Sequence, residues 1–572
     1  MQNNLTILTG QPDNRCNGTA TALAGSSWLW IAMLAVLAFI MFGYPLFLDI
    51  PFLDPDEGLH AAIAQEMVES GDYVQPHLLG VSFSDKPILF FWAQAISLRI
   101  FGMNEAAVRL PGLLFALFGS LTTMLLGWRW FGRNAGLLAG MFHMTLLMPL
   151  ALAQAPVHDV ALVGWTNLVL LAFWNAGHAT NQGGAVRQYL LAGVWIGLAI
   201  LAKGLIGPAI VFVGVGLFLV ATRTLRFRLC LGMAMSLLMG AAVAAPWYVM
   251  MEIQNPGYCY YYFIERHVLG YVTATQQHGN APWWYYLPLL LAGGLPWIGF
   301  LPTAVRDLWQ RRRDAGVTLD SPRTMCWTYL LGGLLFLSTA RSKLLTYLLP
   351  VFPVVALLAA DLWDRYRRGM LSEGCQWMLT RALAMSCAGL AAAMPVAVFV
   401  LQRRFDFHFR GVWIGCAAVV LVMLLPLLWL WRGQATRALA TATFAVAAIF
   451  LFIMTALMPD VAAEMSGREL ARHINRQGHL PSRLLVLEER IGSVIFYLDP
   501  ELRAQLKPDQ FVNIQVDGFC ELPKLQVGEV AVLPRARESR AREFLDVSAV
   551  PCQFVGHYRV YPANELLSKR RS

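Results

Sequence analysis

Three acidic residues stand where long apolar segments begin or end. Asp56 and Glu57 lie in Asp54-Pro55-Asp56-Glu57-Gly58, and Asp159 lies in Val157-His158-Asp159 at the start of another apolar run. Carboxylates at the mouth of a membrane-embedded helix bundle are costly to desolvate, so they usually mark a functional site. Turn formation and helix capping explain either position alone. Two external aspartates at neighbouring helix mouths favour a shared site, with Asp56 and Asp159 as its candidate catalytic residues.

Cationic residues occupy short connections that flank the apolar runs. Lys203 belongs to Ala202-Lys203-Gly204, which is nearly the whole link between two such runs, and Lys86 lies in Asp85-Lys86-Pro87. A lone lysine at an interface is explained by snorkelling. Several cations just above an apolar groove are also what a polyprenyl phosphate requires, because its phosphate needs positive charge and its tail needs an apolar wall. The predicted substrate-binding residues are Lys86, Lys203, Glu57, Arg266, Lys343 and Tyr347.

Histidines near these cations raise the question of a metal. A divalent ion held by a histidine and a carboxylate is chemically reasonable beside phosphates. The candidate ligands are Asp85, His267 and His278, although no ligand spacing requires a metal. No motif demands a cofactor, and neither a GxGxxG loop nor a Walker motif occurs. A divalent cation is therefore the one cofactor that stays open.

The composition is that of a membrane protein. Of 572 residues, 57% are hydrophobic and 14% are charged, whereas soluble domains carry about 25% charged residues. The net charge of +9 comes largely from arginines in short loops between apolar runs. This distribution indicates positive-inside topology rather than a basic surface for nucleic acid. We predict neither a nucleic-acid nor a protein partner.

About thirteen apolar segments are long enough to cross a bilayer. The first, Trp28 to Leu48, is too long for a signal-peptide core and lacks a basic flank, so we interpret it as a retained helix, with a removed signal peptide as the alternative. The segments begin near Trp28, Ala106, Ala135, Val160, Tyr189, Leu205, Leu229, Trp284, Met325, Leu344, Ala382, Gly411 and Ala438. The predicted fold is an α-helical polytopic membrane protein.

Arginine placement predicts which loops face outward. If residues 1–27 form a cytoplasmic tail, the loops after even-numbered segments should carry the excess of arginine, and they do. The arginines concerned are Arg129, Arg133, Arg187, Arg223, Arg226, Arg228, Arg306, Arg311, Arg312, Arg313, Arg365, Arg367, Arg368, Arg432 and Arg437. The loops 49–105 and 251–283 are then external, and so are all the candidate site residues. The outer surface is predicted to be the working surface.

Three regions follow from this reading: the tail 1–27, a membrane domain over 28–462, and a soluble domain over 463–572. The last region alternates polar helix-like segments with strand-like runs at Leu484–Leu487, Ser493–Leu498 and Val530–Leu533, which predicts a small external α/β domain. Cys520 and Cys552 both fall in it, and the sequence leaves open whether they pair.

Several motifs together resemble a known group of enzymes. Asp56-Glu57-Gly58 with Asp85-Lys86-Pro87 resembles the first external loop of the C-superclass (GT-C) glycosyltransferases related to protein O-mannosyltransferases. Ala202-Lys203-Gly204, Ala281-Pro282-Trp283-Trp284-Tyr285-Tyr286 and the run from Ser342 to Pro350 are similar to the 4-amino-4-deoxy-L-arabinose lipid A transferase family. The resemblance covers roughly residues 30–360. Asp85 stands where that family often has Glu, which bears on the sugar more than on the reaction.

The resemblance implies a GT-C fold and an inverting transfer of 4-amino-4-deoxy-L-arabinose from undecaprenyl phosphate to lipid A phosphates. It places this reaction at the periplasmic face of the bacterial inner membrane, with the lipid-linked aminosugar, lipid A and membrane lipid as partners. Two alternatives stay open: a protein O-mannosyltransferase that uses polyprenyl-phosphate mannose, and a lipid transporter or flippase. A transporter would place polar groups near the bilayer midplane and often shows two related halves.

Overall fold

The fold was analysed in a computed structural model, which describes residues 31–272, 281–315, 321–405, 411–487, 492–514 and 528–568. Within these residues, eight helices are long and apolar enough to cross a membrane. They are α4 (Glu105–Phe131), α7 (His158–Gly177), α8 (Gln182–Lys203), α10 (Phe227–Gln254), the segment Leu345–Arg367 with α15 (Phe352–Arg367), α16 (Glu373–Phe405), α17 (Val412–Trp431) and the segment Ala435–Glu464 with α18 (Ala435–Phe452) and α19 (Met458–Glu464).

Two further spans are bent. The pair α5 (Arg133–Thr145) and α6 (Leu147–Ala153) bends by 62°, and the pair α12 (Tyr286–Gly293) and Trp297–Arg313, which includes most of α13 (Leu301–Ala315), bends by 102°. The other apolar segments expected from the sequence form shorter or less apolar helices: Ile31–Phe47, α9 (Ile206–Ala221) and α14 (Pro322–Thr339). The described residues thus hold eight to ten helices that meet the criterion for a span.

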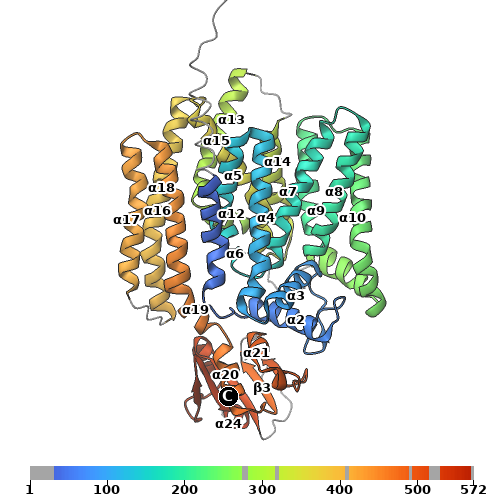
Figure 1. Ribbon diagram of the computed structural model, residues 1–572, viewed down its shortest axis with the longest axis vertical. Coiled ribbons are helices and arrows are strands. Elements are labelled where there is room, and N and C mark those ends of the chain that lie inside the picture. Colours follow the sequence, from blue (N-terminus) through green and yellow to red (C-terminus); the bar gives the residue numbers. More distant parts are fainter. Residues whose placement is uncertain are drawn as a thin grey trace, which may run out of the picture.

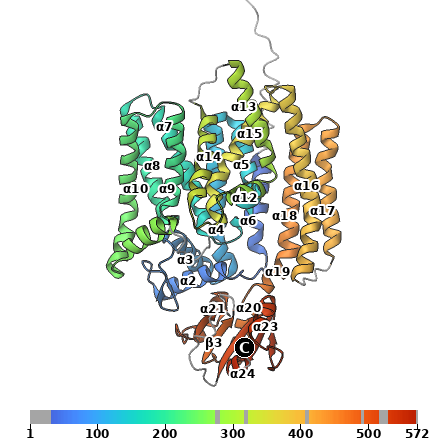
Figure 2. The same cartoon turned by 180° about the vertical axis from the view of Figure 1, so that it is seen from behind.

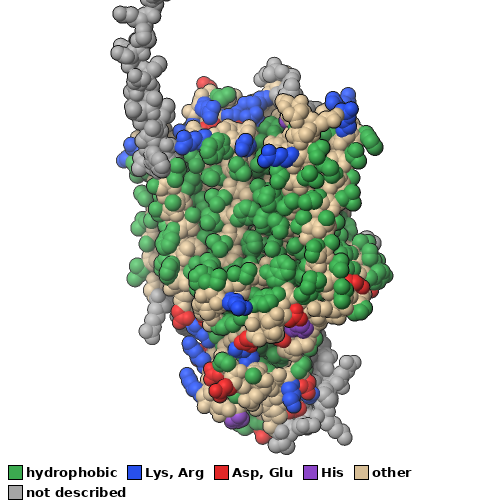
Figure 3. Space-filling view, turned by 45° about the vertical axis from the view of Figure 1, so that its right-hand side comes forward, with side chains coloured by type: hydrophobic (Ala, Val, Ile, Leu, Met, Phe, Trp, Pro, Cys, Tyr) green, Lys and Arg blue, Asp and Glu red, His purple; other side chains and the backbone are tan. Residues whose placement is uncertain are grey.

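The helices form one elongated bundle. In Figures 1 and 2, α16, α17 and α18 lie on one side, α8, α9 and α10 lie on the other, and α4, α5, α14 and α15 fill the middle. Helix α7 lies between α8 and α4. Figure 3 shows a broad hydrophobic band across the face of the bundle that it draws, with Lys and Arg gathered at the end away from the C-terminal domain. A surface of this kind must face lipid, because it is far too apolar for water. The protein is a multi-pass membrane protein.

The first loop between helices folds against the end of the bundle that faces the C-terminal domain (Figure 1). It contains α2 (Asp56–Ser70), a short hairpin of β1 (His77–Leu78) and β2 (Val81–Ser82), and α3 (Leu89–Phe101). The loop therefore contains two helices joined through this hairpin. Most of α2 is buried, including its polar residues His60 and Gln65, so α2 packs inside the protein rather than along its surface.

The tail forms the small α/β domain expected from its sequence. After α20 (Arg468–Gln477), a sheet in the described residues has the order β4-β3-β5-β7-β6, with β3 parallel to β4 and β5. Its strands are β3 (Arg483–Leu487), β4 (Phe511–Ile514), β5 (Glu529–Pro534), β6 (Gln553–Val555) and β7 (Tyr558–Pro562), and its remaining helices are α21 (Gly492–Tyr497), α22 (Pro500–Arg503), α23 (Glu538–Phe544) and α24 (Ala563–Ser568).

One of the three predicted strands was wrong. The runs at 484–487 and 530–533 form β3 and β5, whereas Ser493–Leu498 lies mostly in the helix α21. A short apolar run does not distinguish a strand from a buried helix by pattern alone. Here α21 packs its first residues against α2, and this contact between distant segments is not visible in the local sequence. Cys520, one of the two tail cysteines considered for pairing, lies outside the described residues.

A buried ion-pair network ties helices together at the end of the bundle away from the C-terminal domain. Arg365 of α15 forms two hydrogen bonds with Asp307 of α13, at 2.5 and 2.6 Å. Arg323 in the first turn of α14 does the same with Asp361 of α15, at 2.6 and 2.8 Å. Paired guanidinium and carboxylate groups of this kind fix the relative position of their helices.

Candidate functional site

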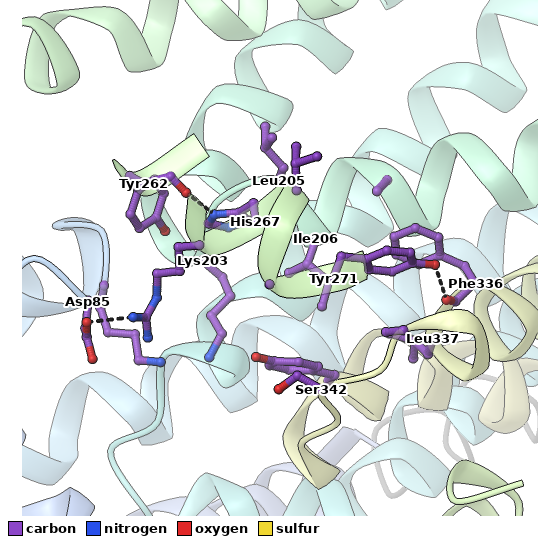
Figure 4. Close-up of a pocket in the computed structure, with 17 residues that line it drawn as sticks. Asp85, Lys203, Leu205, Ile206, Tyr262, His267, Tyr271, Phe336, Leu337 and Ser342 are labelled. Atoms are coloured by element: carbon purple, nitrogen blue, oxygen red, sulfur yellow. Dashed lines mark hydrogen bonds and ion pairs between the residues drawn. The ribbon is translucent and has the colours of Figure 1, made fainter. Parts of the chain in front are cut away.

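A cavity of about 330 Å³ opens where the end of α8, the start of α9 and the end of α14 meet the loops 49–105 and 251–272. Figure 4 shows charged side chains at one end of it, around Asp85 and Lys203, and aromatic and aliphatic side chains at the other, around Phe336 and Leu337. The lining residues are Asp85, Lys86, Lys203, Leu205, Ile206, Ala209, Tyr262, Arg266, His267, Val268, Gly270, Tyr271, Phe336, Leu337, Ala340, Ser342 and Tyr347. One cavity therefore combines a cationic end with an apolar wall.

Asp85 and Arg266 close one side of the cationic end. The Nη1 atom of Arg266 lies 2.6 Å from Asp85 Oδ1, and the hydroxyl of Tyr261 donates a hydrogen bond to the same oxygen at 3.3 Å. Asp85 belongs to the first loop, whereas Arg266 belongs to η3 (Tyr260–Leu269), which follows α10. The nearby carboxylate raises the pKa of Arg266 despite its burial. The ion pair therefore joins these two loops at one side of the cavity.

Lys203 and Asp159 form a second, more deeply buried pair. Lys203 is the last residue of α8 and Asp159 is the second residue of α7. The end of α8 and the start of α7 therefore bring these two side chains together. Lys203 Nζ donates to Asp159 Oδ2 at 2.6 Å and lies 5.5 Å from the ring centroid of Tyr347. Asp159 Oδ1 is buried and has no hydrogen-bond partner among the described residues. This oxygen is available to a ligand group or a water molecule.

Lys86 has no carboxylate at ion-pair distance in the part of the chain that the structure describes. The ammonium of Lys203, burial and the guanidinium of Arg266 lower the pKa of Lys86 to about 7. Counting Lys86, Lys203 and Arg266 against Asp85 and Asp159, the cationic end holds one positive charge more than its carboxylates neutralise. An anion placed there would relieve the repulsion between these cations.

The His267 ring packs against the turn that follows Lys203. The Nδ1 atom of His267 is 2.6 Å from the carbonyl oxygen of Tyr262, as the dashed line in Figure 4 shows. Gly204 follows Lys203 with φ +81°, and a Cβ atom there would lie 2.5 Å from His267 Nε2. Glycine is therefore required both by the backbone conformation and by the close approach of this imidazole. Burial lowers the pKa of His267 and so favours a neutral imidazole.

Two buried histidines link the predicted catalytic aspartates, and sequence reasoning missed both. His60 lies one helical turn after Asp56, and its Nδ1 is 2.9 Å from the Pro156 carbonyl oxygen. The rings of His60 and His158 are 4.8 Å apart, and both nitrogens of His158 are buried without a partner among the described residues. Burial lowers the pKa of His60 to about 4, with the Asp56 carboxylate acting against that shift and Lys86 and Lys203 adding to it. The spacing of His60 from Asp56, and of His158 beside Asp159, was the signal that could have revealed them.

The other predicted residues are not among those that line the cavity. Asp56 is exposed at the start of α2. Glu57 pairs with the buried Arg109 at 2.6 Å and accepts a hydrogen bond from the Leu53 amide. Lys343 donates to the carbonyl oxygens of Ala281 and Ala340. Glu57 and Lys343 thus make contacts within the protein, and their binding roles remain predictions.

The metal site also remains a prediction. Within the described residues no group of three or more His, Cys, Asp or Glu side chains could hold a metal ion. Asp85 and His267 both line the cavity, but Asp85 is paired with Arg266 and His267 uses Nδ1 to bind the Tyr262 carbonyl. His278 lies outside the described residues.

The sequence has relatives among membrane glycosyltransferases. Residues 85–250 match the family described as dolichyl-phosphate-mannose-protein mannosyltransferase. An undecaprenyl phosphate-α-4-amino-4-deoxy-L-arabinose arabinosyl transferase of Aeromonas hydrophila is 35% identical over 341 residues, which are 59% of this chain and 60% of that protein. The enzyme of the same name in Erwinia tasmaniensis is 32% identical over 346 residues, 60% of each chain. The alignments span about three fifths of the length of these relatives.

The fold is shared over a longer stretch. The crystal structure of ArnT from Cupriavidus metallidurans bound to undecaprenyl phosphate matches 94% of this chain and 98% of its own, with a TM-score of 0.70 and 23% identity. The archaeal oligosaccharyltransferase AglB from Archaeoglobus fulgidus matches 90% of this chain and 70% of its own, with a TM-score of 0.52 and 12% identity. The chain is therefore similar to the undecaprenyl phosphate-α-4-amino-4-deoxy-L-arabinose arabinosyl transferases over about three fifths of its length, and it shares its fold with ArnT from Cupriavidus metallidurans.

Proposed function

We propose that the protein is an inverting glycosyltransferase that moves 4-amino-4-deoxy-L-arabinose from undecaprenyl phosphate to the phosphate groups of lipid A. The observation that carries this proposal is the cavity, whose cationic end meets an apolar wall. A lipid phosphate needs both at once, positive charge for its headgroup and an apolar surface for its tail. The names of the relatives support the choice of sugar and carrier.

The charge at the cationic end suits the phosphate of such a donor. Lys86 is the cation without a carboxylate partner in the described part of the chain, while Lys203 and Arg266 are paired. In the reaction, a bond forms between an acceptor phosphate oxygen and the anomeric carbon, and the bond from that carbon to the lipid phosphate breaks. The leaving phosphate regains the negative charge that the acceptor oxygen gives up. Lys86 and Lys203 stabilise that developing charge.

The aspartates have a different task in this reaction. A phosphate acceptor is already ionised near neutral pH, so it needs no general base. Asp159 Oδ1 is buried and free of hydrogen bonds among the described residues, and Asp56 is exposed close to the same histidines. Both carboxylates suit the ammonium group of the aminosugar, which they would hold so that the anomeric carbon faces the acceptor.

The proposed location is the periplasmic face of the bacterial inner membrane. Lys and Arg gather at the end of the bundle away from the C-terminal domain (Figure 3), and such residues favour the cytoplasmic side. The cavity and the C-terminal domain would then face the periplasm, where a lipid-carried donor replaces a nucleotide sugar. Each transferred aminosugar adds a positive charge to lipid A, and this would weaken the binding of polymyxin and other cationic peptides.

A reconstituted transfer assay tests this proposal. Purified protein is mixed with undecaprenyl phosphate-linked aminoarabinose and lipid A, and the products are examined by mass spectrometry. The expected result is lipid A that gains the mass of one or two aminopentose residues. Lipid A of unchanged mass, together with sugar found on a protein or moved across a vesicle without a covalent product, would show that the proposal is wrong.

A further inference from the structure

The C-terminal domain makes a close backbone contact with the loop that carries Asp56. A Cβ atom on Gly58 of α2 would overlap the backbone of Ser493, and a Cβ atom on Gly492 of α21 would lie 2.5 Å from the Leu59 nitrogen. Each glycine therefore lets the other segment approach. Two glycines on opposite sides of one contact allow a distance that larger residues would prevent.

Hydrogen bonds fix the same contact. Asp54 is 2% exposed, and its carboxylate accepts from both the backbone N–H and the hydroxyl of Ser493. The amide of Asp54 in turn donates to the carbonyl of Met465 at 2.9 Å. A buried carboxylate is costly unless donors satisfy it, so the segment just before Asp56 is held by the C-terminal domain.

Further contacts surround this point and limit rotation of the domain. The Phe52 amide donates to the hydroxyl of Tyr497 at 3.1 Å, and that hydroxyl donates to Glu105 at 2.9 Å. The ring of Phe52 lies 4.9 Å from that of Phe496. Farther out, Arg503 pairs with Glu69 at 2.5 Å. Figures 1 and 2 both show α21 facing α2 at the junction of the two domains.

The two histidines connect α2 to residues at the cavity. His60 binds the carbonyl of Pro156 and its ring contacts that of His158. His158 precedes Asp159, which pairs with Lys203. A shift of α2 would therefore move Asp56 directly and would disturb the start of α7, which carries Asp159.

We propose that the C-terminal domain positions Asp56 and Asp159 for the reaction, with Gly492 and Ser493 as positioning residues that act through α2. This inference rests on the proposed function, since it concerns the geometry of sugar transfer. Misplacement of reacting groups by about 1 Å can cost on the order of 100-fold in rate. The cavity residues Lys86 and Arg266 belong to other segments, and the turn at Gly204 that follows Lys203 packs against His267 and Tyr262 rather than α2. Binding of the lipid phosphate should therefore depend much less on this contact.

The test uses the full-length protein with Gly492→Ala, Gly58→Ala, and both changes together. Each single variant should lower kcat by roughly 10- to 100-fold, with the Kd for undecaprenyl phosphate within about twofold of wild type. The double variant should lose little more than either single one, because both changes break one contact. Ser493→Ala, which removes the hydroxyl's hydrogen bonds with Asp54 and with the Gly467 amide but keeps the backbone contact, should show a smaller loss of kcat. Gly389→Ala in α16, where a Cβ atom meets nothing within 4 Å, is the matched control.

Amide hydrogen exchange tests whether the C-terminal domain positions α2, whichever sugar the protein transfers. In Gly492→Ala the backbone amides of α2 and of residues 154–159 should exchange faster than in wild type, and those of α16 should not. Unchanged exchange in α2 would overturn the positioning role. So would faster exchange with unchanged kcat, or a loss of lipid binding as large as the loss of kcat. A wild-type protein that transfers no sugar to lipid A would contradict the proposed function alone.

Discussion

Lys86 lies among other cations, and this position makes its charge sensitive to pH. The pKa of Lys86 is lowered to about 7, chiefly by Lys203, so its amine is charged below that pH and largely neutral above it. A bound phosphate favours the charged form, and binding therefore takes up a proton above pH 7. We expect the affinity for undecaprenyl phosphate to be constant below about pH 7 and to fall by up to about tenfold per pH unit above it. Binding measured from pH 6 to 9 checks this.

Two variants separate the charge of Lys86 from its titration. Lys86→Arg keeps a charge at every pH in this range, so its affinity should not fall above pH 7. Lys86→Ala should bind the lipid phosphate roughly 10- to 100-fold more weakly, the usual value of a charge-assisted hydrogen bond. A wild-type affinity that does not vary between pH 6 and 9 would contradict the assigned role of this amine.

Asp56 and Asp159 should respond differently to the same change. Asp56 is exposed, so Asp56→Asn should leave the free energy of unfolding within about 0.5 kcal/mol of wild type while transfer falls by about 100-fold. Asp159→Asn should also abolish transfer, but it leaves the buried Lys203 ammonium without its partner, at a cost of about 3–5 kcal/mol. Transfer rates and thermal unfolding check both. Full activity in both variants would exclude the carboxylates from the site.

For single residues, the sequence predicted which charged side chains lie in one region better than it predicted which side chains contact each other. Asp85, Lys86, Lys203, Arg266, His267 and Tyr347 all line one cavity, and their roles in binding stay predictions. The sequence did not distinguish Glu57 from its neighbour Asp56. In the structure, the Glu57 side chain is buried against Arg109 and the Asp56 side chain is exposed. Neither that partner nor the contact between His60 and His158 could be found without tertiary structure, because the residues concerned are far apart in the chain.

The turn between α8 and α9 depends on a single glycine. Gly204 has φ +81°, and a Cβ atom there would lie 2.5 Å from His267 Nε2 and 2.8 Å from the Tyr262 hydroxyl. Gly204→Ala should displace Lys203 and weaken undecaprenyl phosphate binding by roughly 10-fold or more, as expected when a charged contact is lost. Gly216→Ala in α9, where a Cβ atom has open space, should bind as wild type does. Equal affinity in the two variants would contradict this account.

Helices were easier to predict than their breaks. Long apolar runs predicted nearly every membrane helix, because hydrophobic length is a property of the local sequence. The bend between α5 and α6 and the break at α12 were not predicted. The switch of Ser493–Leu498 from strand to helix depends on packing against α2, and propensity alone does not decide such a case.

The orientation of the whole molecule can be tested with engineered cysteines. In a variant with Cys230 replaced by Ser, Arg312→Cys at the far end of α13 and Glu501→Cys in the C-terminal domain place exposed thiols at opposite ends of the molecule. An impermeant thiol reagent that reaches the periplasm should label position 501 and not position 312 until the inner membrane is broken. Labelling of position 312 alone in intact cells would reverse the proposed topology.

For the molecule as a whole, the class of fold followed from composition and hydropathy. Arginine positions predicted a charged end opposite the candidate site, and the structure shows this separation (Figure 3). The number of crossings is less well determined by sequence, since eight to ten of the helices in the described residues meet the length and hydropathy criterion. The docking of the C-terminal domain on α2 could not be predicted, because two glycines and a serine in unremarkable contexts carry it.

Helix α14 is fixed by an ion pair in its first turn and lines the cavity near its last turn. Arg323 fixes the first turn of α14 to Asp361, while Phe336 and Leu337 near its last turn form part of the apolar wall. Leu331 and Leu335 on the same helix point outward, 53% and 61% exposed. The Tyr271 hydroxyl donates a hydrogen bond to the Phe336 carbonyl at 2.8 Å, and the two rings stack at 5.4 Å. The apolar wall is therefore tied to the loop that carries Tyr271, so a shift of that loop would change the width of the cavity.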